Sequence, residues 1–133
     1  LAWYFVGMVG LPLLLLRRRK DPEFRRMVAE RLGRGLEALP DSGRPRLLVH
    51  GVSVGEIKSA RSLVERVRAE RPDIEVVLST TTNTGQAIAR QLFPEIRIVR
   101  FPVDPAPVVA RFLERVQPTA IVLVELVAKL QER

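Results

Sequence analysis

From residue 46 onward, short apolar runs alternate with amphipathic segments, and this alternation constrains the fold more than any other feature of the sequence. The apolar runs have the length and β-branched composition of strands; they cover 46–52, 75–79, 97–101 and 120–124. The segments between them place apolar residues on one helical face; they cover 56–70, 84–92 and 105–116. Strands that alternate with helices predict βαβ units, and solid apolar strands predict burial on both sides. We therefore expect an α/β fold, a parallel sheet with helices on both faces, equivalent to half of a doubly wound, Rossmann-like domain.

The candidate functional segments follow from this fold, because ligands of such sheets bind beyond the carboxyl ends of the strands. The segments that follow the predicted strands are 50–56, 80–85, 102–104 and the residues after Val124. No internal repeat in the sequence suggests a different architecture.

The amino-acid composition limits the kinds of functional site that the chain can form. A length of 133 residues suits one domain or part of a larger protein, and 47% hydrophobic residues suffice for a core. The absence of cysteine excludes disulfides, zinc–thiolate sites and cysteine nucleophiles. A single histidine argues against a histidine-rich metal site, so we expect no metal.

The positive charge is concentrated in one segment. The net charge is +7, and the segment 17–34 alone holds eight basic and three acidic residues. Such a concentration predicts an anionic partner: a membrane surface, a phosphorylated substrate or nucleic acid. Phe24 is the only aromatic residue among these charges and no known nucleic-acid module is present, so we expect no nucleic-acid partner.

The first sixteen residues are uncharged and precede the basic run RRRK. As a helix they would extend roughly 24 Å, and Trp3 and Tyr4 are residues that favour membrane interfaces. The alternative is a buried core helix, but the adjacent basic cluster suits lipid headgroups better. We expect a membrane anchor with a basic flank over 1–20, either spanning or inserted, with the rest of the chain in the cytoplasm. A basic helix and connection over 21–45 and the α/β domain over 46–133 would follow.

The stretch HGVSVGE, residues 50–56, holds the only histidine of the chain, a serine between two glycines, and a glutamate. It matches the G-x-S-x-G pattern of a hydrolase nucleophile, but that fold needs a histidine after the serine, and His50 precedes Ser53. No complete dinucleotide or phosphate-loop glycine pattern is present. Glycines and helix-start N–H groups still favour some anionic or polar ligand.

Glu56 has two interpretations. It can stabilise the helix start through the dipole, or it can act as a general base that takes a proton from a hydroxyl group. The helix start lowers a carboxylate's pKa, so a base at this position needs burial or a nearby negative charge to compensate. His50 can be a strand residue or a substrate contact, and Ser53 can cap the helix or line the loop.

HGVSVGE resembles the H-A-V-S-V-G-E motif of the bacterial 3-deoxy-D-manno-octulosonic acid (Kdo) transferases. Further matches follow in the family's order over nearly the whole chain; they are KDPEFRRMVAERLG, STTTNTGQ and RFPVDPAPVVARFLERVQPT. Each motif alone is weak, but HGVSVGE combined with the threonine-rich loop is specific.

The resemblance implies a two-domain, GT-B-type, inverting glycosyltransferase that needs no metal or cofactor. It implies CMP-Kdo as donor and a phosphorylated lipid A precursor (lipid IVA) as acceptor, at the cytoplasmic face of the bacterial inner membrane. The N-terminal half would bind the acceptor, with Glu56 as the base. The implied substrate-binding residues are His50, Gly51, Ser53, Gly55, Thr82, Thr84, Gly85, Asp104 and Glu125.

The end of the sequence departs from the family. The family continues M-E-T-E-L-W-P-N after its fourth strand, whereas this chain continues VELVAKLQER. Glu125 matches the first glutamate, but Val127 stands at the second acidic position and the Trp-Pro pair is missing. The family's C-terminal domain, which binds CMP-Kdo, is not in this sequence, so we expect no transfer by this chain alone. Two alternatives stay open: a remnant that only binds membrane or anionic lipid, and another GT-B enzyme acting on a different lipid-linked sugar.

Overall fold

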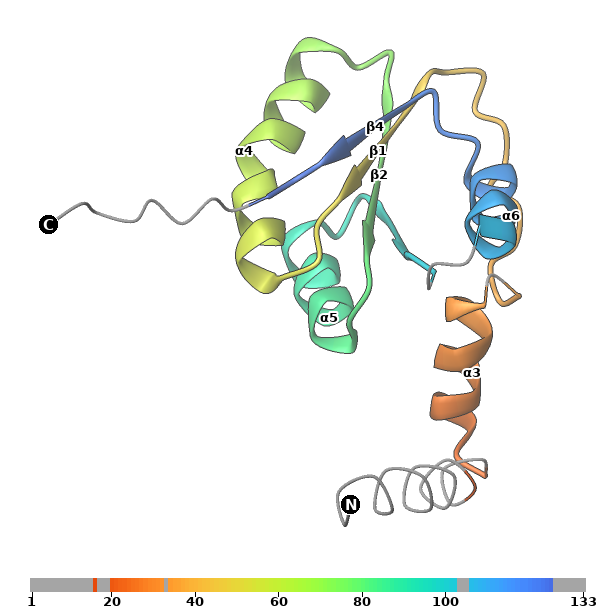
Figure 1. Cartoon of the computed structure of the whole chain (residues 1–133). Helices are drawn as coiled ribbons and strands as arrows, with labels where there is room; N and C mark the ends of the chain where they lie inside the picture. Colours follow the sequence, from red (N-terminus) through yellow and green to blue (C-terminus); the bar gives the residue numbers. More distant parts are fainter. Residues whose placement is uncertain (1–15, 17–19, 33, 103–105, 126–133) are drawn as a thin grey trace, which may run out of the picture.

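The computed structural model describes residues 16, 20–32, 34–102 and 106–125. Helices and strands alternate as the sequence predicts (Figure 1). In chain order the elements are α3 (Pro22–Arg31), β1 (Arg46–His50), α4 (Val54–Glu70), β2 (Glu75–Thr80), α5 (Asn83–Leu92), β3 (Arg97–Arg100), α6 (Ala106–Val116) and β4 (Ala120–Leu123).

The strands form one parallel sheet in the order β3-β2-β1-β4. In the central register, Leu48 of β1 pairs with Val77 of β2 and with Ile121 of β4. This is the order of the first four strands of a Rossmann sheet, in which the chain returns past β1 after β3. The strand order therefore reverses at β1, and the crevice between the carboxyl ends of β1 and β4 is where such folds bind ligands.

Helices cover both faces of the sheet, as the sequence predicts (Figure 1). On one face, Ile57 and Val64 of α4 and Ala89 of α5 pack against alternate residues of β1 and β2. On the other face, Phe112 and Val116 of α6 cover the intervening residues of the same strands and of β3. The alternation of side chains along a strand explains why the central strands are apolar at successive positions.

The edge strand β4 differs from the prediction of burial on both sides. Ile121 is 45% exposed and Leu123 is 65% exposed. Among the described strands β4 pairs only with β1, and α6 packs over Leu48 and Val77 rather than over Ile121. Its apolar run therefore predicts the strand correctly but not its burial.

The two helix starts at the carboxyl edge lie earlier than predicted. β1 ends at His50 instead of residue 52, and α4 begins at Val54 instead of residue 56. The reason is Ser53, whose hydroxyl accepts a hydrogen bond from the backbone N–H of Glu56 and so caps the helix. Thr82 caps α5 in the same way, and that helix begins at Asn83.

At the amino edge, a buried arginine joins three segments. Arg46 is 4% exposed, and its Nε donates to Oε2 of Glu75 at 2.8 Å. Its Nη2 donates to the carbonyl of Pro40 at 2.6 Å, and its Nη1 donates to the carbonyl of Val116. One side chain thus ties the connection before β1 to β2 and to the end of α6.

Helix α3 lies in the segment for which the sequence predicts a basic helix and connection. Asp21 caps it by accepting from the N–H of Glu23 at 3.0 Å, and Pro22 occupies the first turn, where its missing N–H costs nothing. Within the described residues, no helix has the length and apolar character needed to cross a bilayer. The predicted anchor lies almost entirely outside the described residues.

Candidate functional site

The HGVSVGE stretch lies at the carboxyl end of β1, the strand at which the strand order reverses. His50 is the last residue of β1, and Ser53 and Glu56 stand at the start of α4. The backbone N–H of Gly51 donates to the carbonyl of Ser79 at 3.1 Å, and that of Val124 donates to the carbonyl of His50 at 2.9 Å. These bonds continue the pairing of the sheet beyond the last residues of its strands. They hold the loop that follows β1 against the ends of β2 and β4.

Glu56 is held by one of its two carboxylate oxygens. Oε2 accepts from the backbone N–H of Val52 at 2.7 Å and from that of Ser53 at 3.1 Å. Oε1 makes no hydrogen bond to any residue that the structure describes. The hydrogen bonds from Ser53 and Val52 lower the pKa of Glu56, and the nearby His50 adds to this. Glu56 is therefore a carboxylate at neutral pH, with one oxygen fixed and the other able to accept a proton or a hydrogen bond.

His50 is half-buried and oriented by two neighbours. Its Nδ1 lies 2.9 Å from Oγ of Ser79, and its ring lies against Phe101 with the centroids 4.4 Å apart. Burial lowers the pKa of His50, while Ser79 and the charge of Glu56 oppose this in part. The imidazole is therefore predominantly neutral at pH 7, and its Nε2 makes no hydrogen bond to a described residue.

The geometry agrees with the argument against a serine hydrolase. The hydroxyl of Ser53 accepts from the N–H of Glu56 at 3.2 Å, as the cap of α4. The imidazole of His50 bonds Ser79 instead. Ser53 and Glu56 form a capping box, so the helix-stabilising interpretation of both residues describes what they do in this structure.

The threonine-rich loop lies beside this site, after β2. The hydroxyl of Thr82 accepts from the N–H of Gly85 at 2.9 Å, and Thr84 is exposed in the first turn of α5. A Cβ on Gly85 would lie 2.3 Å from Oγ1 of Thr80 and 3.1 Å from Cδ1 of Ile57. Gly85 is thus the residue that lets α5 approach β2 and α4 closely, a role that the sequence alone does not show.

The remaining predicted site residues are more dispersed. Gly51 is buried beneath the first turn of α4, and Gly55 is exposed in that turn. Glu125 is exposed just after β4, next to the end of β1. Asp104 lies outside the described residues.

A second polar cluster, at the ends of β2 and β3, does not follow from the sequence patterns. The guanidinium of Arg100 donates to Glu30 at 2.9 Å, to the carbonyl of Thr81 at 3.0 Å and to Oδ1 of Asn83 at 2.6 Å. Its side chain is only 8% exposed. The partners lie up to 70 residues apart in the chain, so no local pattern connects them. The one sequence signal is a charged residue directly at the end of an apolar strand.

This cluster borders a hollow of about 330 Å³ at the same end of the sheet. Its cationic groups are Arg26, Arg90 and Arg100, and its anionic groups are Glu23 and Glu30. Arg26 and Arg100 both pair with Glu30, whereas Arg90 pairs with no carboxylate among the described residues. Guanidinium groups suit phosphate oxygens, and Arg90 is the cation of this hollow that has no carboxylate partner among the described residues.

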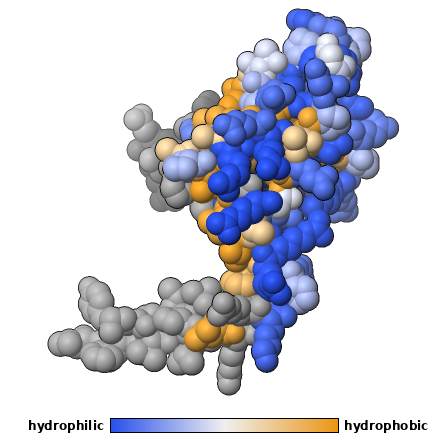
Figure 2. Space-filling model, turned by 90° about the vertical axis from the view of Figure 1, so that its right-hand side faces the viewer, coloured by the Kyte–Doolittle hydropathy of each residue, from blue (hydrophilic) through white to orange (hydrophobic). Residues whose placement is uncertain are grey.

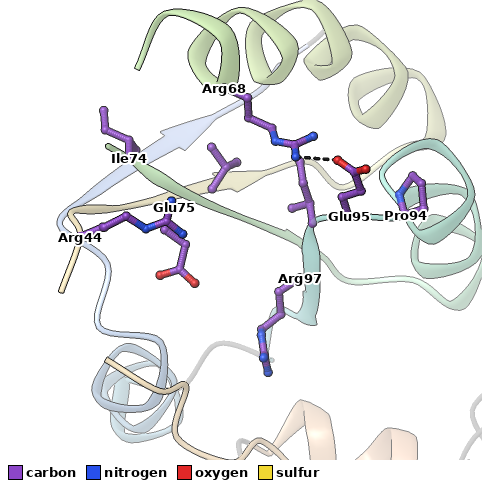
Figure 3. Close-up of a pocket in the computed structure, with 9 residues that line it drawn as sticks. Arg44, Arg68, Ile74, Glu75, Pro94, Glu95 and Arg97 are labelled. Atoms are coloured by element: carbon purple, nitrogen blue, oxygen red, sulfur yellow. Dashed lines mark hydrogen bonds and ion pairs between the residues drawn. The ribbon is translucent and has the colours of Figure 1, made fainter. Parts of the chain in front are cut away.

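A further hollow of about 520 Å³ lies at the opposite, amino edge (Figure 3). Arg68 pairs there with Glu95 at 2.7 Å, and Glu75 is already bonded to Arg46. In parallel α/β sheets ligands bind at the carboxyl edge, where Glu56 lies. We therefore do not assign a site to this hollow. Within the described part of the chain, no group of three or more His, Asp or Glu side chains is placed to share a metal ion.

Comparisons with known proteins point to one family. A family model described as 3-deoxy-D-manno-octulosonic-acid transferase (kdotransferase) matches residues 26–126. The chain is 28% identical over 123 residues to a 3-deoxy-D-manno-octulosonic acid transferase of Chlamydophila psittaci, covering 91% of this chain and 28% of that protein. It is 28% identical over 124 residues to the enzyme of that name from Haemophilus influenzae, covering 91% of this chain and 26% of that protein.

A 3-deoxy-D-manno-octulosonic acid transferase of Rickettsia felis is 29% identical over 83 residues. The chain spans about a quarter of the length of the first two relatives, at 28% and 26%. No solved structure matches it. The family match covers both strand-end motifs and most of the described fold, so this chain belongs to the Kdo transferase family.

Proposed function

We propose that this chain is the acceptor-binding part of an inverting Kdo transferase in which Glu56 is the general base. The observation that carries this proposal is the asymmetric carboxylate, with Oε2 fixed by two backbone N–H groups and Oε1 without a bond to a described residue. A base must be ionised and must present an oxygen to the hydroxyl group that it deprotonates. Family membership supports Kdo as the transferred sugar.

In the proposed reaction, an acceptor hydroxyl oxygen attacks the anomeric carbon of Kdo while Glu56 takes its proton on Oε1. The bond between that carbon and the CMP phosphate breaks, and CMP leaves with the electron pair. Without the acceptor, the carboxylate of Glu56 has a low proton affinity, because hydrogen bonds from Ser53 and Val52 lower its pKa. Closure of the site around the acceptor would exclude water from Oε1 and raise that affinity.

The neighbouring groups have complementary proposed roles. His50, neutral and oriented by Ser79, would hydrogen-bond the acceptor through Nε2. The hollow that contains Arg90 and Arg100 would receive a phosphate of the acceptor, which is the proposed lipid IVA. The donor CMP-Kdo would bind to residues beyond this α/β domain, as in a two-domain GT-B enzyme. We place the reaction at the cytoplasmic face of the inner membrane.

The test replaces Glu56 with Gln in a full-length transferase that carries residues 1–125 of this chain. Gln also serves at the third position of a capping box, so the fold should persist. We expect the rate of Kdo transfer from CMP-Kdo to fall by about 10²–10⁴-fold, the usual contribution of a general base. Glu65→Gln is the matched control, because Glu65 is an exposed carboxylate on the same helix, paired with Arg61 at 2.8 Å.

A Glu56→Gln enzyme that keeps its rate while remaining folded would disprove the base assignment. Measuring the rate against several lipid-linked sugars would show whether the acceptor is a lipid A precursor or another lipid. Acceptor binding without transfer in the unmodified full-length protein would instead indicate a lipid-binding remnant.

A further inference from the structure

Helix α3 contacts the α/β domain through its polar side chains, which reverses the usual arrangement of an amphipathic helix. Glu30 pairs with the buried guanidinium of Arg100 at 2.9 Å, and Nη2 of Arg31 donates to the carbonyl of Thr81 at 3.2 Å. Nδ2 of Asn83 lies 3.8 Å from the sulfur of Met27. No residue of this helix is fully buried. The polar side of α3 is therefore occupied by the domain.

The apolar side of the same helix remains uncovered by the described residues. Phe24, Val28 and Leu32 follow one another at four-residue spacing, which places them on one face. Val28 is 37% exposed and Leu32 is 36% exposed. Together with Arg25 and Arg34 they line an open apolar groove of about 480 Å³. Figure 2 shows hydrophobic atoms beside hydrophilic ones over the narrow part of the molecule that joins the domain to the grey N-terminal residues.

We propose that this apolar face of α3 lies on an anionic lipid surface, with the helix parallel to the membrane plane. Phe24, Val28 and Leu32 would enter the boundary between headgroups and acyl chains, and Arg25 and Arg34 would reach the lipid phosphates. The charge at the rim of the groove favours this occupant, because arginines beside an apolar face suit anionic headgroups. A two-fold contact with a second copy would instead bring two arginine-rimmed grooves together, and the like charges would repel.

The placement of α3 also orients the candidate site. The polar face of the helix is bonded to Arg100 and Thr81, at the carboxyl ends of β3 and β2. A helix held against lipid would therefore hold this edge of the sheet next to the membrane (Figure 1). A lipid acceptor could then reach Glu56 without leaving the bilayer. This consequence rests on the proposed function, whereas the lipid contact itself does not.

The test uses site-specific fluorescence on the full chain, which contains no cysteine and can carry a single new one. Val28→Cys and Leu32→Cys are labelled with an environment-sensitive nitrobenzoxadiazole probe. Leu63→Cys is the matched control, because Leu63 is a leucine on α4 with a similar exposure of 39%. With vesicles of phosphatidylcholine and phosphatidylglycerol, we expect emission at positions 28 and 32 to rise at least about twofold and shift to the blue. The probe at position 63 should not change.

Charge is tested separately with the double variant Arg25→Gln/Arg34→Gln. Neither arginine side chain makes a hydrogen bond to a described residue, so the fold should persist. We expect binding to phosphatidylglycerol vesicles to weaken by up to roughly 30-fold, as two basic residues near an anionic surface predict. The control is Arg61→Gln/Arg66→Gln, which removes two exposed arginines from α4.

The outcomes separate the competing occupants. One outcome is that the chain sediments with vesicles without any change in the emission of the probes on α3, as for the probe on α4. In that case α3 does not contact lipid and the inference is wrong. The proposed membrane location would then depend on other residues. If the chain does not bind vesicles at all, both proposals about the membrane are wrong, and the role of Glu56 is unaffected. If emission at positions 28 and 32 rises without lipid and increases with protein concentration, a second copy of the chain covers this face.

Discussion

The amino and carboxyl ends of the same four strands are built differently. At the amino end, Arg46 is buried and each of its side-chain nitrogens has an acceptor, from Glu75, Pro40 or Val116. At the carboxyl end, Glu56 uses one oxygen to hold the loop and leaves the other without a partner among the described residues. The comparison of these two residues indicates that Arg46 uses all its polar atoms to hold the amino end together, whereas Glu56 keeps one oxygen available at the carboxyl end.

The amino end should give the largest loss of stability. Arg46→Met leaves Glu75 without its buried cation and two carbonyls without a donor, so we expect unfolding to become easier by about 3 kcal/mol. Urea unfolding followed by circular dichroism measures this. Arg68→Met is the control at the same end, because the Arg68–Glu95 pair is exposed and should be worth about 0.5 kcal/mol or less. Equal losses in the two variants would show that the buried pair has no special role.

At the carboxyl end, the two glycines should respond unequally. A Cβ on Gly85 would lie 2.3 Å from Oγ1 of the buried Thr80, whereas a Cβ on Gly51 would have its nearest contacts at 3.4 Å. We expect Gly85→Ala to cost about 1–3 kcal/mol, as overpacking of a core does, and Gly51→Ala to cost clearly less. Thermal unfolding of the two variants tests this. The opposite order would mean that the approach of α5 to β2 is not what requires a glycine.

His50 should give the smallest effect, as a dependence of stability on pH. Its pKa is lowered below 6.5 in the folded chain by burial, so the unfolded chain takes up a proton first as pH falls. We expect the free energy of unfolding to decrease as pH falls through the ordinary histidine pKa of about 6.5, and His50→Gln to remove this decrease. Glu56 itself stays ionised there, because its pKa is lowered from 4.5. An NMR titration of the single histidine that gives a pKa above 6.5 would contradict the prediction.

Most of the fold could be predicted from sequence because the signals are local. Apolar runs and helical periodicity predict every described strand and the three helices between them, and Ser53 and Thr82 are local capping signals. The exposure of Ile121 and Leu123 could not be predicted, because apolar composition reports strand propensity and not which elements lie over the strand.

The candidate site could be predicted from the sequence only in part. HGVSVGE places His50, Ser53 and Glu56 together because they are adjacent in sequence. The bond between His50 and Ser79 depends on the register of two strands, and the pairing of Arg100 with Glu30 depends on how α3 docks. Neither has a local pattern. The orientation of α3, with its charged side inward, is likewise a tertiary feature.

The most direct test of the central claim is an NMR titration of this chain in detergent with a lipid A precursor, followed through the backbone amides. If the carboxyl end binds the acceptor, the shifts should gather at Val52, Ser53 and Thr82 and should be small at the amino end. Shifts that gather instead at Arg44, Arg68 and Arg97, around the hollow at the amino end, would contradict the assignment of the site. So would the absence of any shift at saturating acceptor.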